Sequence, residues 1–214
     1  MSTSERPLAT LIGDVVASRT AASRAALHQR LLDLLEEVNA TGPAVPLRIT
    51  VGDEFQGCFE DLGSAVRAVR MLRLGGLPEV DLRFGIGWGP VTVLQAEPRV
   101  EDGPGWWAAR AAIEHVADEA ARAGTRRLRT SYRRADGVAG PDPAAVNAAL
   151  LLRDEVIGGL SSRSLSVVRG LLGGRTQGEI AEAEQISASA VSQRVRKDGL
   201  AMLVAAEALL EEVR

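Results

Sequence analysis

The sequence predicts an α+β protein in which a mixed segment of strands and helices precedes an all-helical one. Strand-like and helix-like apolar patterns alternate up to residue 134. Residues 135–143 are rich in turn formers and poor in apolar side chains, as connections between domains are. After them, every apolar pattern has helical spacing. We therefore expect one domain at 1–134, a linker at 135–143 and a helical domain at 144–214.

The composition bounds the class of protein. Apolar runs are far shorter than the roughly 20 residues that cross a bilayer, and the first residues lack the pattern of a signal peptide. A single cysteine, Cys58, and two histidines argue against an internal disulfide and a zinc cluster. The net charge of −3 argues against indiscriminate coating of nucleic acid. We expect a cytoplasmic protein with no membrane partner.

The first segment alternates strands and helices. In chain order the pattern predicts a buried strand, a helix, a hairpin with an acidic tip, a helix, a glycine-rich strand or hairpin, a helix and a short strand. These elements are expected at 8–16, 27–38, 47–59, 62–74, 81–93, 106–123 and 127–132. Glycines inside the strand at 81–93 indicate a bulge or a close backbone approach. Two β-α-β style units of this length imply an α/β sandwich with helices on one face.

The second segment is predicted to be helical throughout. Its helices are expected at 144–157, 161–172, 176–183 and 187–197, followed by an amphipathic stretch through Leu210. Ser161, Thr176 and Ser187 stand where helix N-caps are favoured. Gly173 and Gly174 form a plausible helix stop.

Residues 176–196 have the spacing of a helix-turn-helix. Ala181 is small where two helices would cross, Ile186 would plug the turn, and Val191 would anchor the second helix. The pattern resembles the helix-turn-helix of LuxR-type regulators and of the last sigma-factor region. Gln185 stands where that family often has glycine, and a left-handed turn there would cost roughly 1 kcal/mol. The resemblance implies that the second helix enters the major groove of DNA.

Polar and basic side chains of this pair are the candidate DNA contacts. Within 187–197 there are three basic residues and no acid, and such groups reach phosphates and base edges. The candidates are Thr176, Gln177, Ser187, Ser189, Ala190, Ser192, Gln193, Arg194, Arg196 and Lys197. A charge-neutral domain binds DNA weakly as a monomer, so a homodimer is expected. The alternatives are a helical protein-interaction module and a sigma-like contact with RNA polymerase.

Two carboxylates follow apolar strands in the first segment. Asp14 lies near the end of the strand predicted at 8–16, and Asp53 lies in the predicted hairpin. If those strands are neighbours, both side chains reach one edge of the sheet, where hard oxygen ligands favour Mg²⁺. The turn at 15–18 would enter a helix and offer its backbone N–H groups to phosphates. The alternative is a helix cap at Asp14 and an ordinary acidic hairpin tip at Asp53.

The order of motifs adds a resemblance. Gly13-Asp14, then Gly52-Asp53-Glu54-Phe55, then the stretches 83–89 and 102–110 follow the succession seen in class III nucleotidyl cyclases. The hairpin is also similar to that of GGDEF diguanylate cyclases. The chain resembles the SatD family most closely, over about residues 8–135, a family that often carries a helix-turn-helix tail.

This resemblance implies a ferredoxin-like cyclase palm that binds a purine nucleotide. Asp14 and Asp53 would be the metal ligands, and Arg110 the helix arginine that meets phosphate. The implied nucleotide-binding residues are Asp14, Val15, Val16, Ala17, Ser18, Arg19, Gly52, Asp53, Glu54 and Arg110.

Two positions depart from the cyclase pattern. Trp106 replaces the asparagine that stabilises the transition state, and Ile49 replaces the purine-selecting lysine. Losing groups that stabilise developing charge costs several kcal/mol, so the sequence favours a sensor over an enzyme. We expect a nucleotide-responsive, DNA-binding transcription regulator that uses Mg²⁺. The alternative is an active nucleotidyl cyclase or NTPase with an accessory helix-turn-helix.

Overall fold

A five-stranded sheet forms the centre of the first segment in the computed structural model, which describes residues 2–3, 6–18 and 23–214. The strand order is β3-β4-β2-β5-β8, and every neighbouring pair is antiparallel except the parallel pair β5–β8. The strands are β2 (Leu8–Val15), β3 (Val45–Val51), β4 (Glu54–Phe59), β5 (Leu82–Gly89) and β8 (Thr130–Arg134). A small separate sheet joins β1 (Ser2–Thr3), β6 (Thr92–Gln95) and β7 (Val100–Asp102).

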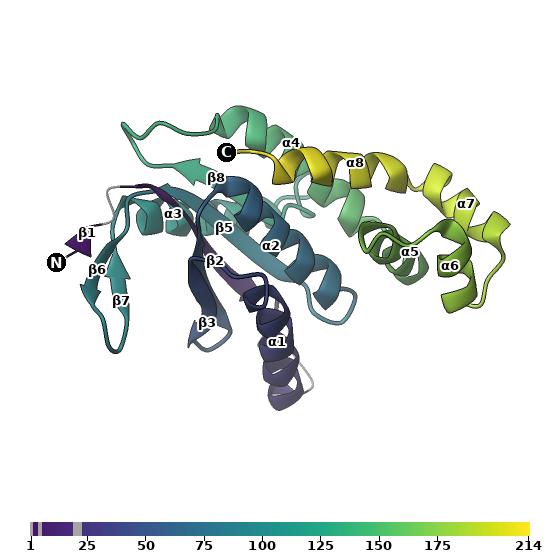
Figure 1. Ribbon diagram of the computed structural model, residues 1–214, viewed down its shortest axis with the longest axis horizontal. Helices are drawn as coiled ribbons and strands as arrows, with labels where there is room; N and C mark the ends of the chain where they lie inside the picture. The colour runs from purple at the N-terminus through teal and green to yellow at the C-terminus, as the bar shows by residue number, and fades with distance from the viewer. Residues whose placement is uncertain (1, 4–5, 19–22) are drawn as a thin grey trace.

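Helices cover both faces of the central sheet. On one face, α1 (Arg24–Asn39) and α2 (Leu62–Gly76) bury their leucines and valines against Leu11, Phe84 and Ile86 (Figure 1). On the other face, α3 (Pro104–Ala120) packs Ala109 and Ile113 against Ile12. The expectation of helices on one face only is therefore wrong. Both faces of β5 are buried, because bulky residues face α2 while glycines alternate with them and face α3.

The expected helices after residue 143 are present. They are α4 (Pro143–Gly158), α5 (Ser162–Leu172), α6 (Gln177–Ala183), α7 (Ala188–Lys197) and α8 (Leu200–Glu211). Ser161, Thr176 and Ser187 cap α5, α6 and α7 as predicted, each accepting a hydrogen bond from a backbone N–H of the first turn. Among the described residues, no helix is both long and apolar enough to cross a membrane.

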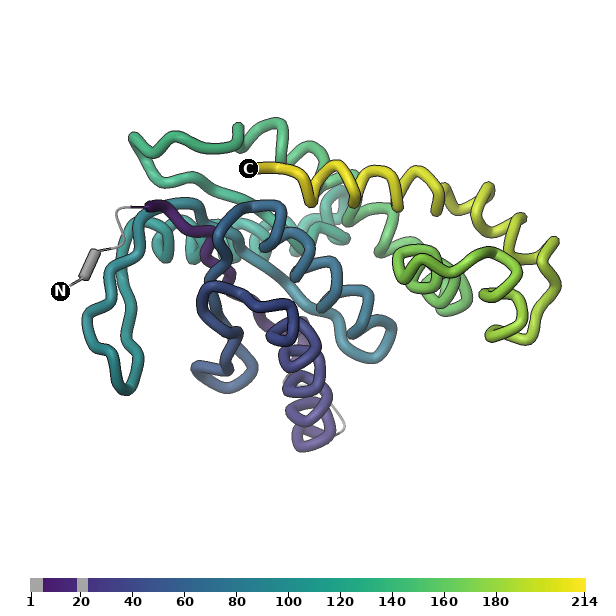
Figure 2. The backbone as a smooth tube through the Cα atoms, viewed as in Figure 1, coloured from purple at the N-terminus to yellow at the C-terminus, as the bar shows by residue number. Residues whose placement is uncertain are grey.

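The helical segment packs back onto the sheet domain. Helix α4 contacts β8, and α8 contacts α2 and α4, so the chain returns and ends beside the sheet (Figure 2). The N–H of Gly63 donates to the Val213 carbonyl at 2.9 Å. Inside the contact, the buried Arg73 guanidinium of α2 is 2.6 Å from the Asp154 carboxylate of α4. The α+β class is confirmed, but nothing supports a separate all-α helix-turn-helix domain.

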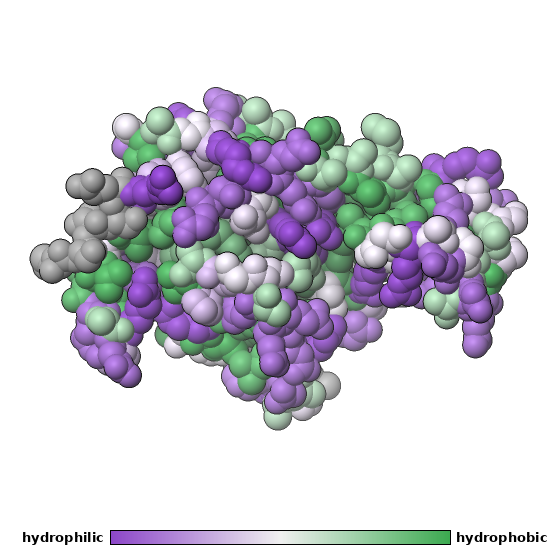
Figure 3. All heavy atoms as spheres, viewed as in Figure 1, coloured by the Kyte–Doolittle hydropathy of each residue, from purple (hydrophilic) through white to green (hydrophobic). Residues whose placement is uncertain are grey.

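The surface of the helical segment is mixed in character. Figure 3 shows apolar atoms along α8, where Met202 is 77% exposed and Leu209 is 68% exposed. The main cores lie elsewhere, one beneath α1 and α2 and one among α5 to α8. Apolar side chains exposed on one helix face are common in proteins.

Candidate functional site

The two predicted carboxylates lie together at one edge of the sheet. Asp14 is near the end of β2, and Asp53 is in the turn between β3 and β4, the strand that pairs with β2. An oxygen of the Asp53 carboxylate accepts a hydrogen bond from the Val15 N–H at 3.1 Å. The turn that contains Asp53 is therefore fixed to the residue that follows Asp14.

An arginine that the sequence analysis did not assign completes this edge. Arg83 faces Asp14 across β2 and β5, and its guanidinium donates two hydrogen bonds to the carboxylate, at 2.8 and 2.7 Å. The hydrogen bond with Asp14 raises the pKa of Arg83, and the charge of Asp53 raises it further. The sequence signal that could have identified Arg83 is its charge within an otherwise apolar, glycine-rich strand. Its partner depends on the strand register, which the pattern does not show.

Arg110 is also paired with a predicted site residue. From α3, its guanidinium donates to both carboxylate oxygens of Glu54, each at 2.7 Å. This contact raises the pKa of Arg110, and the side chain stays 44% exposed. Glu54 therefore holds the predicted phosphate-binding arginine at the margin of the site.

The turn after β2 only partly matches the predicted phosphate loop. The N–H of Val15 bonds to Asp53, and that of Val16 donates to the Asp81 carbonyl at 2.8 Å. Neither N–H is free for a phosphate. Ala17 adopts a φ of 56°, a left-handed conformation that costs a non-glycine residue about 1–3 kcal/mol. Arg19 lies outside the described residues, and α1 begins only at Arg24.

Two adjoining cavities open at this edge. The first, of about 460 Å³, contains Asp14, Asp53, Glu54 and Arg83 in its lining, together with the turn at 15–18 and Val51. The second, of about 320 Å³, lies against α1 and Gly52. Both share Ser18 and Asp53. The first cavity is charged, whereas Leu27 and Leu31 give the second an apolar wall beside His28.

The donors present are compatible with Mg²⁺. Asp14 and Asp53 line one cavity, and carboxylate oxygens with spare lone pairs are the ligands that this ion takes, usually one or two per site. In the part of the chain that the structure describes, no cluster of three or more metal-binding side chains occurs. A metal here would therefore need phosphate or water oxygens as its remaining ligands.

The two positions that depart from the cyclase pattern lie away from the cavities. Trp106 is 7% exposed and packs in the core under α3, where its indole N–H has no partner among the described residues. Ile49 packs at the margin of the core under α1. Neither side chain lines either cavity, so neither position supplies a group to reacting atoms there.

The predicted DNA-contacting residues lie on α6 and α7 or cap them. Thr176 forms a capping box with Glu179, and Ser187 accepts from the Ala190 N–H. Gln185 adopts the expected left-handed turn, with φ 54°. The remaining candidates, Gln177, Ser189, Ser192, Gln193, Arg194, Arg196 and Lys197, are exposed or half-buried. Arg194 donates back to the Ala190 carbonyl at 3.2 Å.

Solved structures with similarity to this chain include nucleotidyl cyclases. A bacterial light-regulated adenylyl cyclase is 11% identical, with 62% of this chain and 44% of that chain covered and a TM-score of 0.47. The catalytic core of a rhodopsin-guanylyl cyclase with converted specificity, in complex with ATPαS, is 17% identical, with 53% and 74% covered and a TM-score of 0.42. The guanylyl cyclase Cya2 is 15% identical, with 53% and 71% covered and a TM-score of 0.39.

The chain spans less than half the length of the light-regulated cyclase that it matches. Comparison with curated proteins gives no match.

The prediction of a DNA-binding transcription regulator is wrong. Solved structures similar to this chain include nucleotidyl cyclases, no finding shows DNA binding, and α8 of the helical segment packs on α2 and α4, while α5 to α7 contact one another and α5 and α7 contact α8. DNA and RNA polymerase are unsupported as partners, and the homodimer inferred from DNA binding loses its basis.

One sequence profile covers both segments of the chain. It matches residues 8–210, from the start of β2 into α8, and its description is the SatD family. The match therefore includes the helical segment as well as the sheet domain. Because it spans nearly the whole sequence, the chain belongs to the SatD family.

Proposed function

We propose that this protein binds a purine nucleoside triphosphate with Mg²⁺ at the edge of the sheet and cleaves it, as a nucleotidyl cyclase or as an NTPase. A cyclase-type palm, which the motif order implies, is part of this proposal. The observation that carries it is the convergence of Asp14 and Asp53 on one cavity, with Arg83 bonded to Asp14. Carboxylates beside a fixed cation, in a cavity open to solvent, suit a metal-bound polyphosphate.

In this proposal each residue has a distinct task. Asp14 and Asp53 hold the metal, and Arg83 keeps the Asp14 carboxylate in place. Arg110 exchanges Glu54 for a phosphate oxygen when the nucleotide enters. Bound Mg²⁺ would neutralise phosphate charge and align the triphosphate for attack.

The neighbouring cavity offers room for the base. It joins the charged cavity through Ser18 and Asp53, so one molecule could occupy both. Leu27 and Leu31 supply an apolar surface for a flat ring, while Arg24 and His28 supply hydrogen-bond donors. A charged compartment beside an apolar one matches the two ends of a nucleotide.

Hydrolysis is the second candidate reaction, and the position of Trp106 favours it. Cyclisation requires a group that stabilises the charge developing on the α-phosphate. Trp106, which stands at the position of the asparagine that supplies this group in the cyclase pattern, is buried in the core. When water attacks the terminal phosphate instead, the developing charge can be stabilised by the metal and by the arginines at this edge of the sheet.

Product analysis tests the proposal and separates the two reactions. The full chain is incubated with labelled ATP or GTP and Mg²⁺, and products are separated by chromatography. A cyclic nucleotide identifies a cyclase, and a nucleoside diphosphate identifies a hydrolase. Asp14→Asn and Asp53→Asn should each reduce turnover by about 100-fold or more.

The matched control is Asp118→Asn. Asp118 is an exposed carboxylate of α3 and lines neither cavity, so its amide should leave turnover unchanged. Absence of turnover in the parent, or turnover that both site variants retain in full, would overturn the proposal.

A further inference from the structure

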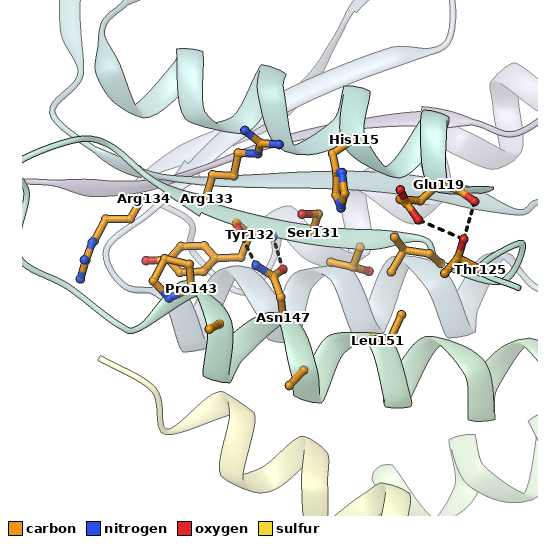
Figure 4. A pocket seen from close by; sticks show the side chains of 14 residues that line it. His115, Glu119, Thr125, Ser131, Tyr132, Arg133, Arg134, Pro143, Asn147 and Leu151 are labelled. Carbon is orange, nitrogen blue, oxygen red and sulfur yellow. Dashed lines mark hydrogen bonds between the residues drawn. The ribbon is translucent and has the colours of Figure 1, made fainter. Parts of the chain in front are cut away.

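A cavity bounded by other elements lies away from the candidate nucleotide site. It has a volume of about 750 Å³ and is bounded by α3, α4 and the edge strand β8 (Figure 4). None of its lining residues lines the cavity that contains Asp14 and Asp53. Pockets that bind small molecules have volumes of about 300–1,000 Å³, so this space is of suitable size.

The cavity walls are fixed by hydrogen bonds. Asn147 of α4 accepts from the Tyr132 N–H and donates to the Tyr132 carbonyl, both at 2.8 Å. Asp154 accepts from the Thr130 N–H at 2.6 Å. These contacts occupy backbone groups on the outer edge of β8, so a further strand cannot pair there. They also hold α4 at a set position, which keeps the cavity open between α4 and α3.

One hydroxyl group on the cavity wall has no hydrogen-bond partner in the described part of the chain. Ser131 as a whole is 4% exposed, but its hydroxyl oxygen is not among the fully buried polar atoms that lack a partner, so it borders the open space of the cavity. A hydroxyl that borders such a space can exchange water for a ligand group as its hydrogen-bond partner. Figure 4 shows Ser131 below His115, in the space between β8 and α3. The hydroxyl is therefore available to something that enters this space.

The charge of the cavity favours an anion. Arg133 extends from β8 toward α3 (Figure 4) and forms no ion pair or hydrogen bond with a described residue. His115 adds a further donor side chain, whereas Arg134 donates to the Gly140 carbonyl at 2.7 Å and points away from α3 (Figure 4). The one carboxylate in the lining, Glu119, is already paired with Arg122 and accepts from the Thr125 hydroxyl at 3.1 Å. The exposed Arg133 therefore has no ion-pair partner among the described side chains that an entering anion would have to displace.

The α4 wall is apolar. Ala144, Ala148 and Leu151 face the cavity, and Leu151 is 43% exposed. A bare inorganic anion would leave this wall in water. A molecule with an anionic group and an apolar body would bury it and would also meet Arg133 and Ser131.

We propose that this cavity binds a small organic anion, a carboxylate or a phosphate ester that carries an apolar group. Arg133 and His115 meet the charge, the Ser131 hydroxyl donates a hydrogen bond, and Leu151 packs on the apolar part. The site does not depend on the nucleotide proposal, because the two cavities share no residue.

Calorimetric titration of the full chain without Mg²⁺ tests this site with four probes. Phenyl phosphate and benzoate carry both features, inorganic phosphate carries only charge, and benzyl alcohol carries only the ring. At least one of the first two should bind tenfold or more tightly than either single-feature probe, and Arg133→Gln or Ser131→Ala should weaken that binding about tenfold. Preference for benzoate assigns a carboxylate, and preference for phenyl phosphate assigns a phosphate ester.

Arg126→Gln is the matched control, since Arg126 is exposed and lies outside the cavity lining. It should leave binding unchanged. Equal affinities for all four probes would overturn the proposal, as would binding that survives both cavity substitutions. Circular dichroism of each variant establishes that a loss of binding is not a loss of fold.

Discussion

At the scale of single residues, the candidate site consists of opposite charges held in fixed pairs. Asp14 with Arg83 and Glu54 with Arg110 are both bidentate pairs. Such pairs fix geometry as well as charge. Asp14 and Arg83 are 23% and 26% exposed, so solvent screens their attraction only in part. A polyphosphate that approaches Asp14 therefore meets a carboxylate whose charge is already partly balanced.

The first prediction concerns Arg83. Arg83→Gln should weaken nucleoside triphosphate binding in the presence of Mg²⁺ by about tenfold, because Asp14 then repels phosphate and loses its orientation. Calorimetry with a slowly hydrolysed ATP or GTP analogue measures the change. Arg163→Gln, at an exposed position on α5, is the control and should bind as the parent does. Unchanged or tighter binding by Arg83→Gln would mean that Arg83 competes with the metal for Asp14.

Sequence patterns predicted the carboxylates better than their partners. Asp14 and Asp53 each follow an apolar strand, and that position alone suggested a shared edge. The pairing of Asp14 with Arg83 depends on strand register, and that of Glu54 with Arg110 depends on how α3 lies across the sheet. Both are set by tertiary packing, which periodicity does not encode.

At the scale of elements, the position of α3 depends on glycines of β5. A Cβ at Gly85 would collide with the Ala109 carbonyl, and one at Gly87 with the Gly105 carbonyl. The Thr10 hydroxyl reaches the same carbonyl of Gly105 at 2.8 Å. This close approach sets where Arg110 of α3 meets the site. The close backbone approach that the glycines indicated in the sequence is confirmed, whereas the placement of helices on a single face was wrong.

The second prediction tests that contact. Gly87→Ala should lower the free energy of unfolding by about 1–3 kcal/mol, because the added methyl group must push α3 from the sheet. Urea denaturation measures the loss. Gly124→Ala is the matched control, since a Cβ there meets nothing within 4 Å, and it should be nearly neutral. Equal stabilities of the two variants would show that α3 shifts without cost.

At the scale of the whole molecule, a buried ion cluster joins the helical segment to the sheet domain. The cluster comprises Arg73, Arg153, Asp154 and Glu207, each at most 3% exposed. Arg73 contacts Asp154 at 2.6 Å, and Arg153 lies 3.9 Å from Glu207. Periodicity predicted helices in this segment correctly but suggested an independent domain, because a helical pattern does not show which partner a helix packs against.

The third prediction is that Asp154 is essential for stability. Asp154→Asn leaves the Arg73 charge buried without its partner and should cost about 3–5 kcal/mol of unfolding free energy. Glu155→Gln is a neighbouring control that removes only an exposed ion pair with Arg127, worth less than about 1 kcal/mol. Chemical denaturation compares the two. A cost for Asp154→Asn no greater than that for Glu155→Gln would refute the role of the cluster.

The fourth prediction concerns pH. Burial raises the pKa of Glu207 above its ordinary value of 4.5, against the opposing charges of Arg153 and Arg70, while Glu211 and Asp154 raise it further. The folded state therefore binds the proton more tightly than the unfolded state, so this residue lowers stability as pH rises above about 4.5 through the raised pKa. The free energy of unfolding of Glu207→Gln, taken relative to that of the parent, should therefore increase from pH 5 to pH 8. Chemical denaturation of both proteins at pH 5 and at pH 8 measures this difference. A difference that becomes smaller as pH rises would contradict the prediction.

Mg²⁺-dependent nucleotide binding tests the central claim most directly. Calorimetry of the full chain with slowly hydrolysed ATP and GTP analogues, with and without Mg²⁺, is compared among the parent, Asp14→Asn and Asp53→Asn. The account predicts that Mg²⁺ strengthens binding to the parent and that either substitution removes most of this gain, since each takes away a metal ligand. If both variants bind as tightly as the parent with Mg²⁺ present, or if the parent binds neither analogue at millimolar concentration, then the cavity of Asp14 and Asp53 is not a metal–nucleotide site.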